Sequence, residues 1–386
     1  MNDRRRNRLI LALWVIAAVA ATITAIQRHE NNFEIFRSAG SGFAAGQDLY
    51  AASAQHFDLF KYTPSAAMFF LPFSMLSFAL GLLLWNAVNA GTLYWSIGRL
   101  LAPREATIVR LIVLPEMFGS LQAAQSNALI AALIILTFTE LERRRECSAA
   151  VAVCIGTVIK IFPLGAASFG LLRPERRRFA WCCAIVAVVL LAAPMVFRGP
   201  SWLLHQYDDW FLIQRVDSGD PGFSVMALVR LWFGVSWPFW PQQLVGVAAL
   251  LAPIVVSSDI VRGNEWRLRY VASLLIFSVI FNHQSEGPSF VIAMAGVGIW
   301  FVFTRPSWQR WLLLACVLVF TVVASSSLTP RSIRAVLFDI RLKSVPLVLV
   351  WILLQVELWR QPVASASPSS VRHRLDLSEL SSGDAS

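Results

Sequence analysis

The sequence LILALWVIAAVAATITAI occupies residues 9–26 and follows the basic residues Arg4, Arg5, Arg6 and Arg8. A helix needs about 20 mostly apolar residues to cross the ~30 Å hydrocarbon core of a bilayer. This run exceeds the apolar core of a signal peptide, roughly 7–15 residues, so we interpret it as a membrane anchor. Because basic residues stay on the cytoplasmic side of a span, we predict a cytoplasmic N-terminus and an outer location for the next segment.

Apolar runs of this kind recur along most of the 386 residues, of which 57% are hydrophobic and 15% charged. Soluble domains carry about 25% charged residues. The runs are continuous rather than alternating, which indicates helices and not a β-barrel. The sequence therefore predicts an all-α polytopic membrane protein, a bundle of roughly 10–11 spanning or re-entrant helices.

The net charge of +10 comes from arginine clusters between the apolar runs, so it indicates orientation and gives no reason to expect nucleic acid as a partner. The main clusters lie in residues 99–110, 143–145, 173–178, 262–269 and 305–310. If all of these clusters lie in the cytoplasm, every polar turn that could form a functional site lies on the outer face. We expect a multi-pass protein of the inner (plasma) membrane, with one domain over residues 1–360, an outer loop over residues 27–63 that carries short helices, and a disordered cytoplasmic tail over residues 361–386.

Two segments fit simple crossings poorly. Residues 148–171 are too short to cross twice, so we predict two short helices that meet at Lys160-Ile161-Phe162-Pro163. Residues 64–98 must cross an odd number of times, and we predict that part of this stretch is re-entrant or broken near Pro72.

The outer loop supplies two candidate catalytic carboxylates, Glu34 and Asp58. A partly desolvated carboxylate can take a proton from a hydroxyl group. Asp58 is the more suggestive because Lys61 and Tyr62, which could bind substrate, follow within one helical turn. The alternative is an interfacial loop with solvated charges and with its rings in the aromatic belt of the membrane.

Two further turns offer substrate-binding groups. Gln125 and Asn127 could hydrogen-bond a polyhydroxylated ligand, although Asn127 could equally cap a helix. Lys160 lies inside an apolar stretch, where a charge marks a candidate site and a phosphate is a natural partner. The alternative for Lys160 is an ammonium that extends to the interface.

The segment Asn282-His283-Gln284-Ser285-Glu286 is a second dense polar cluster. Asn282, His283 and Glu286 could orient sugar hydroxyls, or His283 and Glu286 could act as an acid–base pair. No second histidine completes a zinc set, so we predict no metal and no cofactor, although a carboxylate-bound divalent cation remains an alternative.

Arg331 and Arg334 lie on the predicted outer face, against the general charge trend. Positive charge there favours an anionic partner, and arginine suits phosphate. The alternative is that the predicted topology is inverted at this point.

Taken in order, these features resemble glycosyltransferase family 87 (the DUF2029 group), polytopic enzymes of the GT-C fold related to bacterial polyprenyl-phosphomannose-dependent mannosyltransferases. The likeness covers roughly residues 30–360 and includes Gly46 to Tyr50, Tyr62-Thr63-Pro64 with Pro72, Leu84-Trp85-Asn86, Gln125-x-Asn127 and Lys160-x-x-Pro163.

The resemblance implies inverting transfer of a hexose, by analogy mannose, from a polyprenyl-phosphate sugar to a glycan or glycolipid acceptor on the outer face of the membrane. It also implies an acidic base in the first outer loop. The family often has an Asp before the first aromatic residue of that loop, where this chain reads Asn31-Asn32-Phe33-Glu34. We therefore expect Asp58 or Glu34 to serve as the base; the alternative is a membrane scaffold without catalytic activity.

The competing class is a transporter or a flippase for lipid-linked sugars. Such proteins usually show paired internal repeats and bind near the bilayer midplane. This sequence has no evident repeat, and its polar clusters lie at helix ends, which favours the transferase.

Overall fold

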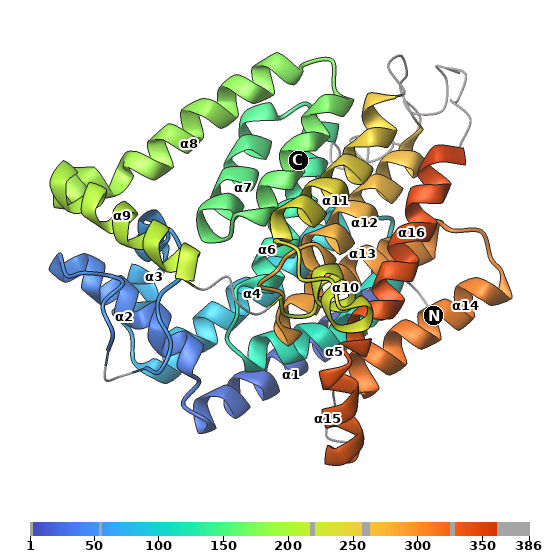
Figure 1. Cartoon of the computed structure of the whole chain (residues 1–386), viewed down its shortest axis with the longest axis horizontal. Helices are drawn as coiled ribbons and strands as arrows, with labels where there is room; N and C mark the ends of the chain where they lie inside the picture. Colours follow the sequence, from blue (N-terminus) through green and yellow to red (C-terminus); the bar gives the residue numbers. More distant parts are fainter. Residues whose placement is uncertain (1–2, 54–55, 217–220, 257–262, 325–328, 361–386) are drawn as a thin grey trace, which may run out of the picture.

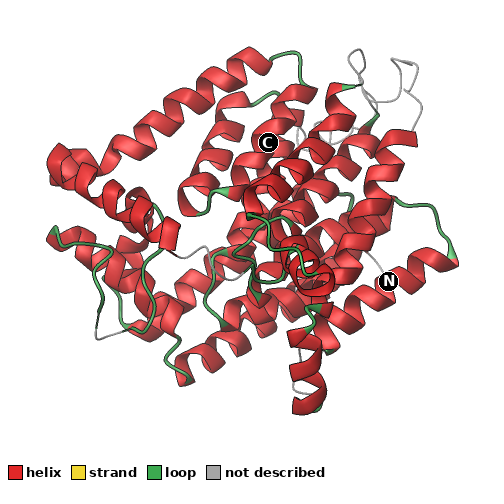
Figure 2. Ribbon diagram, in the orientation of Figure 1, coloured by secondary structure: helices red, strands yellow, loops and turns green. Residues whose placement is uncertain are grey.

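The computed structural model describes residues 3–53, 56–216, 221–256, 263–324 and 329–360, and within these ranges it consists of helices and loops without a strand (Figures 1 and 2). The predicted tail, residues 361–386, lies outside the described residues. The all-α prediction is confirmed.

The α-helices follow one another along the whole described chain. They are α1 Asp3–Gln27, α2 Asn31–Ala45, α3 Pro64–Ser74, α4 Phe78–Leu100, α5 Pro103–Gln122, α6 Asn127–Glu142, α7 Glu146–Ile159, α8 Arg176–Arg198, α9 Pro200–Val216, α10 Val225–Phe233, α11 Phe239–Val255, α12 Asn264–Ile280, α13 Phe290–Phe303, α14 Trp308–Leu318, α15 Arg331–Asp339 and α16 Val345–Arg360. Short 3₁₀ segments are η1 Phe162–Leu172, η2 Gly287–Ser289 and η4 Leu342–Ser344, and η3 Val319–Val323 is a π-helical turn.

Three helical segments are long and apolar enough to cross a membrane by length and composition, namely Arg4–Gln27, Arg176–Arg198 and Leu342–Arg360. Shorter apolar helices include Phe239–Val255 and Gly287–Phe303. The chain is thus an all-α polytopic membrane protein, and the predicted number of spanning helices remains a prediction.

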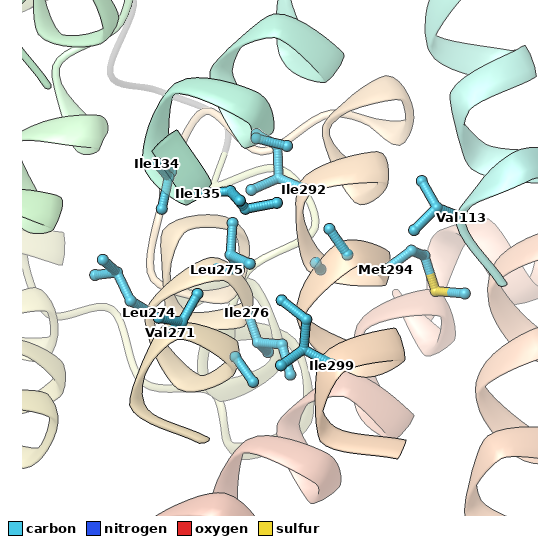
Figure 3. Packing of buried hydrophobic residues seen from close by; sticks show 14 of the residues in the cluster. Val113, Ile134, Ile135, Val271, Leu274, Leu275, Ile276, Ile292, Met294 and Ile299 are labelled. Carbon is cyan, nitrogen blue, oxygen red and sulfur yellow. The ribbon is translucent and has the colours of Figure 1, made fainter. Parts of the chain in front are cut away.

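The core lies between α12 and α13, with α5, α6 and α16 around them. Figure 3 shows Leu275 and Ile276 of α12 beside Ile292 and Ile299 of α13, with Ile135 of α6 on one side. Both helices are apolar on nearly all sides, which is typical of helices buried by their neighbours. At Gly296 a Cβ atom would lie 2.6 Å from the Ala272 carbonyl oxygen, so the close approach of α13 to α12 requires a residue without a side chain there.

Arginine clusters from distant segments meet at one end of the bundle, which we call the arginine end. There Arg99 pairs with Glu140 at 2.6 Å, and Glu142 pairs with Arg267 at 2.9 Å and Arg173 at 3.5 Å. The start of α1 lies at this end too, because Asn7 Oδ1 accepts hydrogen bonds from Tyr94 and Arg110.

The opposite helix ends gather at what we call the cavity end, where α5, α7 and α12 finish and α6 and α13 begin. The sequence predicted that the basic clusters would share one side and the polar turns the other, and the helix directions and ion pairs agree with that separation.

Both predicted breaks are confirmed. Helix α7 ends at Ile159, and η1 begins at Phe162 with Pro163 in its first turn. Helix α3 ends at Ser74, just after Pro72, and α4 begins at Phe78 with Ser77 as its N-cap. The predicted outer loop also carries a helix, α2.

Candidate active site

A cavity of about 380 Å³ lies at the cavity end of the bundle. Its walls come from the loop before α3, the turns α5–α6, α7–η1 and α12–η2, and side chains of α2, α9 and α11. Polar side chains dominate the chemistry of the lining: Asn32, Asp58, Lys61, Tyr62, Gln125, Lys160, Gln214, Gln243, Asn282, His283, Gln284 and Glu286.

Eight of the predicted site residues therefore share one cavity although they come from four separate turns. They are Asp58, Lys61, Tyr62, Gln125, Lys160, Asn282, His283 and Glu286. Asn127 lies just behind the wall, where its side chain contacts Lys160.

The loop that precedes α3 holds Asp58 and Lys61 together. Lys61 Nζ lies 3.2 Å from Asp58 Oδ2, and the other carboxylate oxygen accepts a 2.8 Å hydrogen bond from the Leu59 amide. The Asp58 side chain is 44% exposed, so solvent and substrate can reach it. A carboxylate that is anchored through one oxygen and accessible can serve as a base.

Backbone carbonyls fix the path of this loop. Trp210 Nε1 and Gln214 Nε2 of α9 both donate to the Lys61 carbonyl oxygen, at 3.2 and 2.8 Å. The Tyr50 hydroxyl donates to the carbonyl of Tyr62 at 2.7 Å, and Thr63 Oγ1 donates to the carbonyl of Val158 at 2.7 Å. The loop is thus fastened to α9 and α7.

The α5–α6 turn directs Gln125 into the cavity. Its backbone closes as a Schellman motif, with hydrogen bonds from Ala124 N to Leu121 O and from Gln125 N to Ser120 O. Ala124 has a φ of 49°, in the left-handed region that favours glycine. Trp85 Nε1 donates to the Ala124 carbonyl at 2.8 Å and stabilises the turn.

Gln125 joins two sides of the cavity. Its Oε1 accepts from the Tyr62 hydroxyl and its Nε2 donates to Glu286 Oε2, each at 3.4 Å. The amide can exchange these long hydrogen bonds for hydrogen bonds to a hydroxylated ligand.

Lys160 occupies the turn between α7 and η1. Its Nζ donates a 2.7 Å hydrogen bond to Asn127 Oδ1 and lies 6.0 Å from the centroid of the Tyr62 ring. Desolvation lowers the pKa of Lys160 to about 8, although the charge of Glu286 opposes this shift. The ammonium group is therefore a poorly solvated cation inside the cavity, suited to an anionic ligand.

The α12–η2 turn presents His283 and Glu286. Gln243 of α11 contacts His283 Nδ1 at 3.1 Å, and the Phe239 ring stacks on the imidazole. The Glu286 amide contacts the Ser289 hydroxyl at 3.4 Å, so local capping sets the direction of this carboxylate.

Lining residues to which the sequence analysis gave no site role include Asn32, Trp210, Gln214, Gln243 and Gln284. Trp210 and Gln214 are four residues apart and so share one face of α9. That spacing of two polar-tipped side chains was the available signal. Gln243 has no comparable signal, because its position depends on how α11 packs beside the α12–η2 turn.

The other three predicted site residues lie elsewhere. Glu34 is not among the lining residues and pairs with Arg37 at 3.4 Å and with His29 at 3.8 Å. Arg331 and Arg334 belong to α15 and do not line the cavity either. The predicted phosphate-binding role of these two arginines therefore has no support in the cavity.

Within the described residues, no group of three or more His, Cys, Asp or Glu side chains could hold a metal ion. The described lining offers carboxylates at Asp58 and Glu286, ammonium groups at Lys61 and Lys160, the imidazole of His283, and hydrogen-bonding hydroxyl and amide groups.

The chain is thus a polytopic helical membrane protein with a polar cavity at one end of the bundle. The family model of glycosyltransferase family 87 matches residues 60–326. The chain belongs to this family and is a membrane glycosyltransferase. A search of curated proteins found no match.

Proposed function

We propose that this chain is an inverting glycosyltransferase of the GT-C type, in which residues 1–360 form one catalytic unit of the inner (plasma) membrane with a cytoplasmic N-terminus. It transfers a hexose, with mannose the first sugar to test, from a polyprenyl-phosphate sugar to a hydroxyl of a glycan or glycolipid on the outer face. The observation that carries the proposal is the convergence of Asp58 and Lys160 on one cavity.

The reaction needs a base, and Asp58 takes this role. Its carboxylate removes the proton from the acceptor hydroxyl while the oxygen attacks the anomeric carbon of the donor sugar. The bond from the anomeric carbon to the phosphate oxygen breaks, and the electron pair leaves with the polyprenyl phosphate. Attack opposite to the leaving group inverts the anomeric configuration.

The leaving phosphate gains negative charge, and the Lys160 ammonium stabilises it. A fixed cation in a poorly solvated site stabilises developing charge more than water does. The hydrogen bond from Lys160 Nζ to Asn127 Oδ1 holds that cation in place before the donor binds.

The remaining polar groups orient the sugar. Lys61 neutralises Asp58 at 3.2 Å until substrate binds, and Tyr62 and Gln125 offer a hydroxyl and an amide to ring hydroxyls. Asn282, His283 and Glu286 do the same from the opposite wall. None of these roles requires a metal ion.

A reconstituted assay tests the proposal. The purified protein in liposomes receives polyprenyl-phosphate mannose and a set of glycan and glycolipid acceptors, and sugar transfer is measured with and without EDTA. Asp58→Asn should abolish transfer, whereas Glu34→Gln, a matched carboxylate in the same outer loop, should retain it. Transfer that survives Asp58→Asn but not Glu34→Gln would overturn the assignment of the base.

The same liposomes separate transfer from transport. A flippase would move the lipid-linked sugar across the bilayer without breaking the bond from sugar to phosphate. Translocation of intact donor with no transfer to any acceptor would overturn the proposed function.

A further inference from the structure

Two short helices at the cavity end expose apolar surface. Helix α15 contains no buried residue, and Figure 1 shows it projecting from the rest of the bundle. At the end of α10, Leu231, Trp232 and Phe233 are exposed, and Phe233 is 72% exposed. The nearby Trp237 is exposed as well.

The exposed apolar residues of α15 lie mostly on one face of the helix. Ile333, Val336 and Ile340 share one face at helical spacing and are exposed by 51%, 58% and 37%. Phe338, on the other side, packs edge-on against Phe223 with ring centroids 5.0 Å apart. The helix thus holds to the protein by one side and turns its apolar face outward.

The two helices are joined into one surface. Trp232 Nε1 of α10 donates a 3.1 Å hydrogen bond to the Ile340 carbonyl at the end of α15. Arg341, just beyond α15, lies over the rings of Phe223 and Phe338, at 5.2 and 4.8 Å from their centroids. We call the exposed end of α10 and the apolar face of α15 the α10–α15 surface.

The position and composition of this surface indicate what covers it. The candidate membrane span Leu342–Arg360 begins directly after α15, so the surface lies where the chain enters the bilayer. Tryptophan is enriched at membrane–water interfaces, and exposed basic side chains such as those of Arg230 and Arg331 attract anionic lipid headgroups. A short helix with one apolar face lies in this interface without crossing the membrane.

Hydrogen bonds connect the α10–α15 surface to the cavity. The Ser344 hydroxyl donates to the Phe223 carbonyl at 2.8 Å, and the Phe223 amide donates to the Ser285 carbonyl at 2.8 Å. Lys343 Nζ lies 3.5 Å from the Gly287 carbonyl. Ser285 and Gly287 flank Glu286, which lines the cavity.

We propose that the α10–α15 surface docks on the headgroup layer of the bilayer, prefers anionic phospholipid, and thereby steadies the turn that carries Glu286. Arg331 then belongs to lipid docking and not to donor binding. The effect on Glu286 rests on the proposed function, whereas lipid docking does not.

Site-specific fluorescence tests the docking. An environment-sensitive NBD probe is attached at Ile333→Cys or, as a matched control, at Ala335→Cys, which is also exposed but faces away from the apolar side. The five native cysteines, Cys147, Cys154, Cys182, Cys183 and Cys316, are first replaced by alanine so that the probe labels only the introduced thiol. The probe at position 333 should shift to shorter wavelength and be quenched by headgroup-proximal doxyl lipids, and the probe at 335 should do neither.

Lipid composition tests the preference for negative charge. Replacing phosphatidylcholine by phosphatidylglycerol should increase the blue shift at position 333, and the increase should disappear in Arg230→Gln/Arg331→Gln. Arg305→Gln, an exposed substitution next to the arginine end, should leave it unchanged.

Equal solvent access for the probes at 333 and 335 would overturn the proposal. A probe at 333 that is shielded from solvent but not quenched by lipid, in a protein that migrates as a dimer, would show that a second copy covers the surface, and this would overturn it too. If docking is observed but sugar transfer is absent in every lipid, the proposed function fails while the docking stands.

Discussion

Lys160 Nζ donates a 2.7 Å hydrogen bond to Oδ1 of Asn127, a side chain that is fully buried at the start of α6. The cavity lysine is therefore positioned by a neighbouring helix before any ligand arrives. Preorganised charge of this kind needs little rearrangement when a phosphate binds.

Removing the Lys160 cation should reduce catalysis strongly. We expect Lys160→Met to lower kcat/KM for the lipid-linked donor by about 10²–10³-fold, the usual loss when a fixed stabilising group is removed. Lys160→Arg should retain part of the activity, because it keeps the charge but cannot reproduce the compact ammonium. Steady-state transfer kinetics in liposomes measure both. An unchanged kcat/KM in Lys160→Met would show that the leaving phosphate binds elsewhere.

The depressed pKa of Lys160 predicts a pH dependence. Below about pH 8 the free enzyme carries an ammonium and binds the anionic donor, and above this pKa the neutral amine does not. We expect kcat/KM to fall about tenfold per pH unit well above pH 8, because kcat/KM reports the free enzyme. The Lys160→Arg variant remains charged, so its profile should stay flat in this range. The same fall in both variants would assign the titration to another group.

Lys343 and Glu116 form a buried ion pair at 3.1 Å, between η4 and α5. We expect Lys343→Met to lower the free energy of unfolding by about 3–5 kcal/mol, because it leaves a buried carboxylate without its partner. The double variant Glu116→Gln/Lys343→Met should recover most of this loss. Denaturant unfolding in detergent micelles measures each free energy. A double variant as unstable as Lys343→Met would mean that packing around Phe290, and not charge, governs the effect.

The left-handed backbone at Ala124 predicts effects of different size for two substitutions at this site. Ala124→Gly relieves about 1 kcal/mol of strain but loses a buried methyl group of similar value, so stability should hardly change. Ala124→Val should destabilise by about 1–3 kcal/mol, because a β-branched residue resists a positive φ. Thermal unfolding of the two variants provides the comparison, and equal melting temperatures would contradict the proposed strain.

Helix ends and breaks were predictable where proline and charge act locally. The Lys160–Pro163 turn is an example, since proline ends one helix and favours the start of the next. The gathering of arginines at one end was equally predictable, because the membrane imposes the same rule on every span.

Residue pairing across the fold was less predictable. Glu34 and Asp58 occupy the same predicted outer loop, and only packing shows that Asp58 lines the cavity while Glu34 turns to Arg37. The pair Glu34–Arg37 has helical i, i+3 spacing and could have been recognised as a local ion pair. Arg331 does not line the cavity, and charge pattern alone does not distinguish an anionic substrate from an anionic membrane surface, so its substrate-binding role stays a prediction.

The two hydrogen bonds from α9 to the Lys61 carbonyl extend the influence of the bilayer into the cavity. Helix α9 follows α8 after the single residue Gly199. The structure describes all of α8, and its buried residues are Phe179 and Pro194. Helix α8 packs against α7 along one side and exposes its other side, so it can tilt to match the local hydrocarbon thickness. Hydrophobic mismatch at α8 would therefore move Trp210 and Gln214, and with them the loop that carries Asp58. The thickness of the membrane would then affect the position of Asp58 in the cavity.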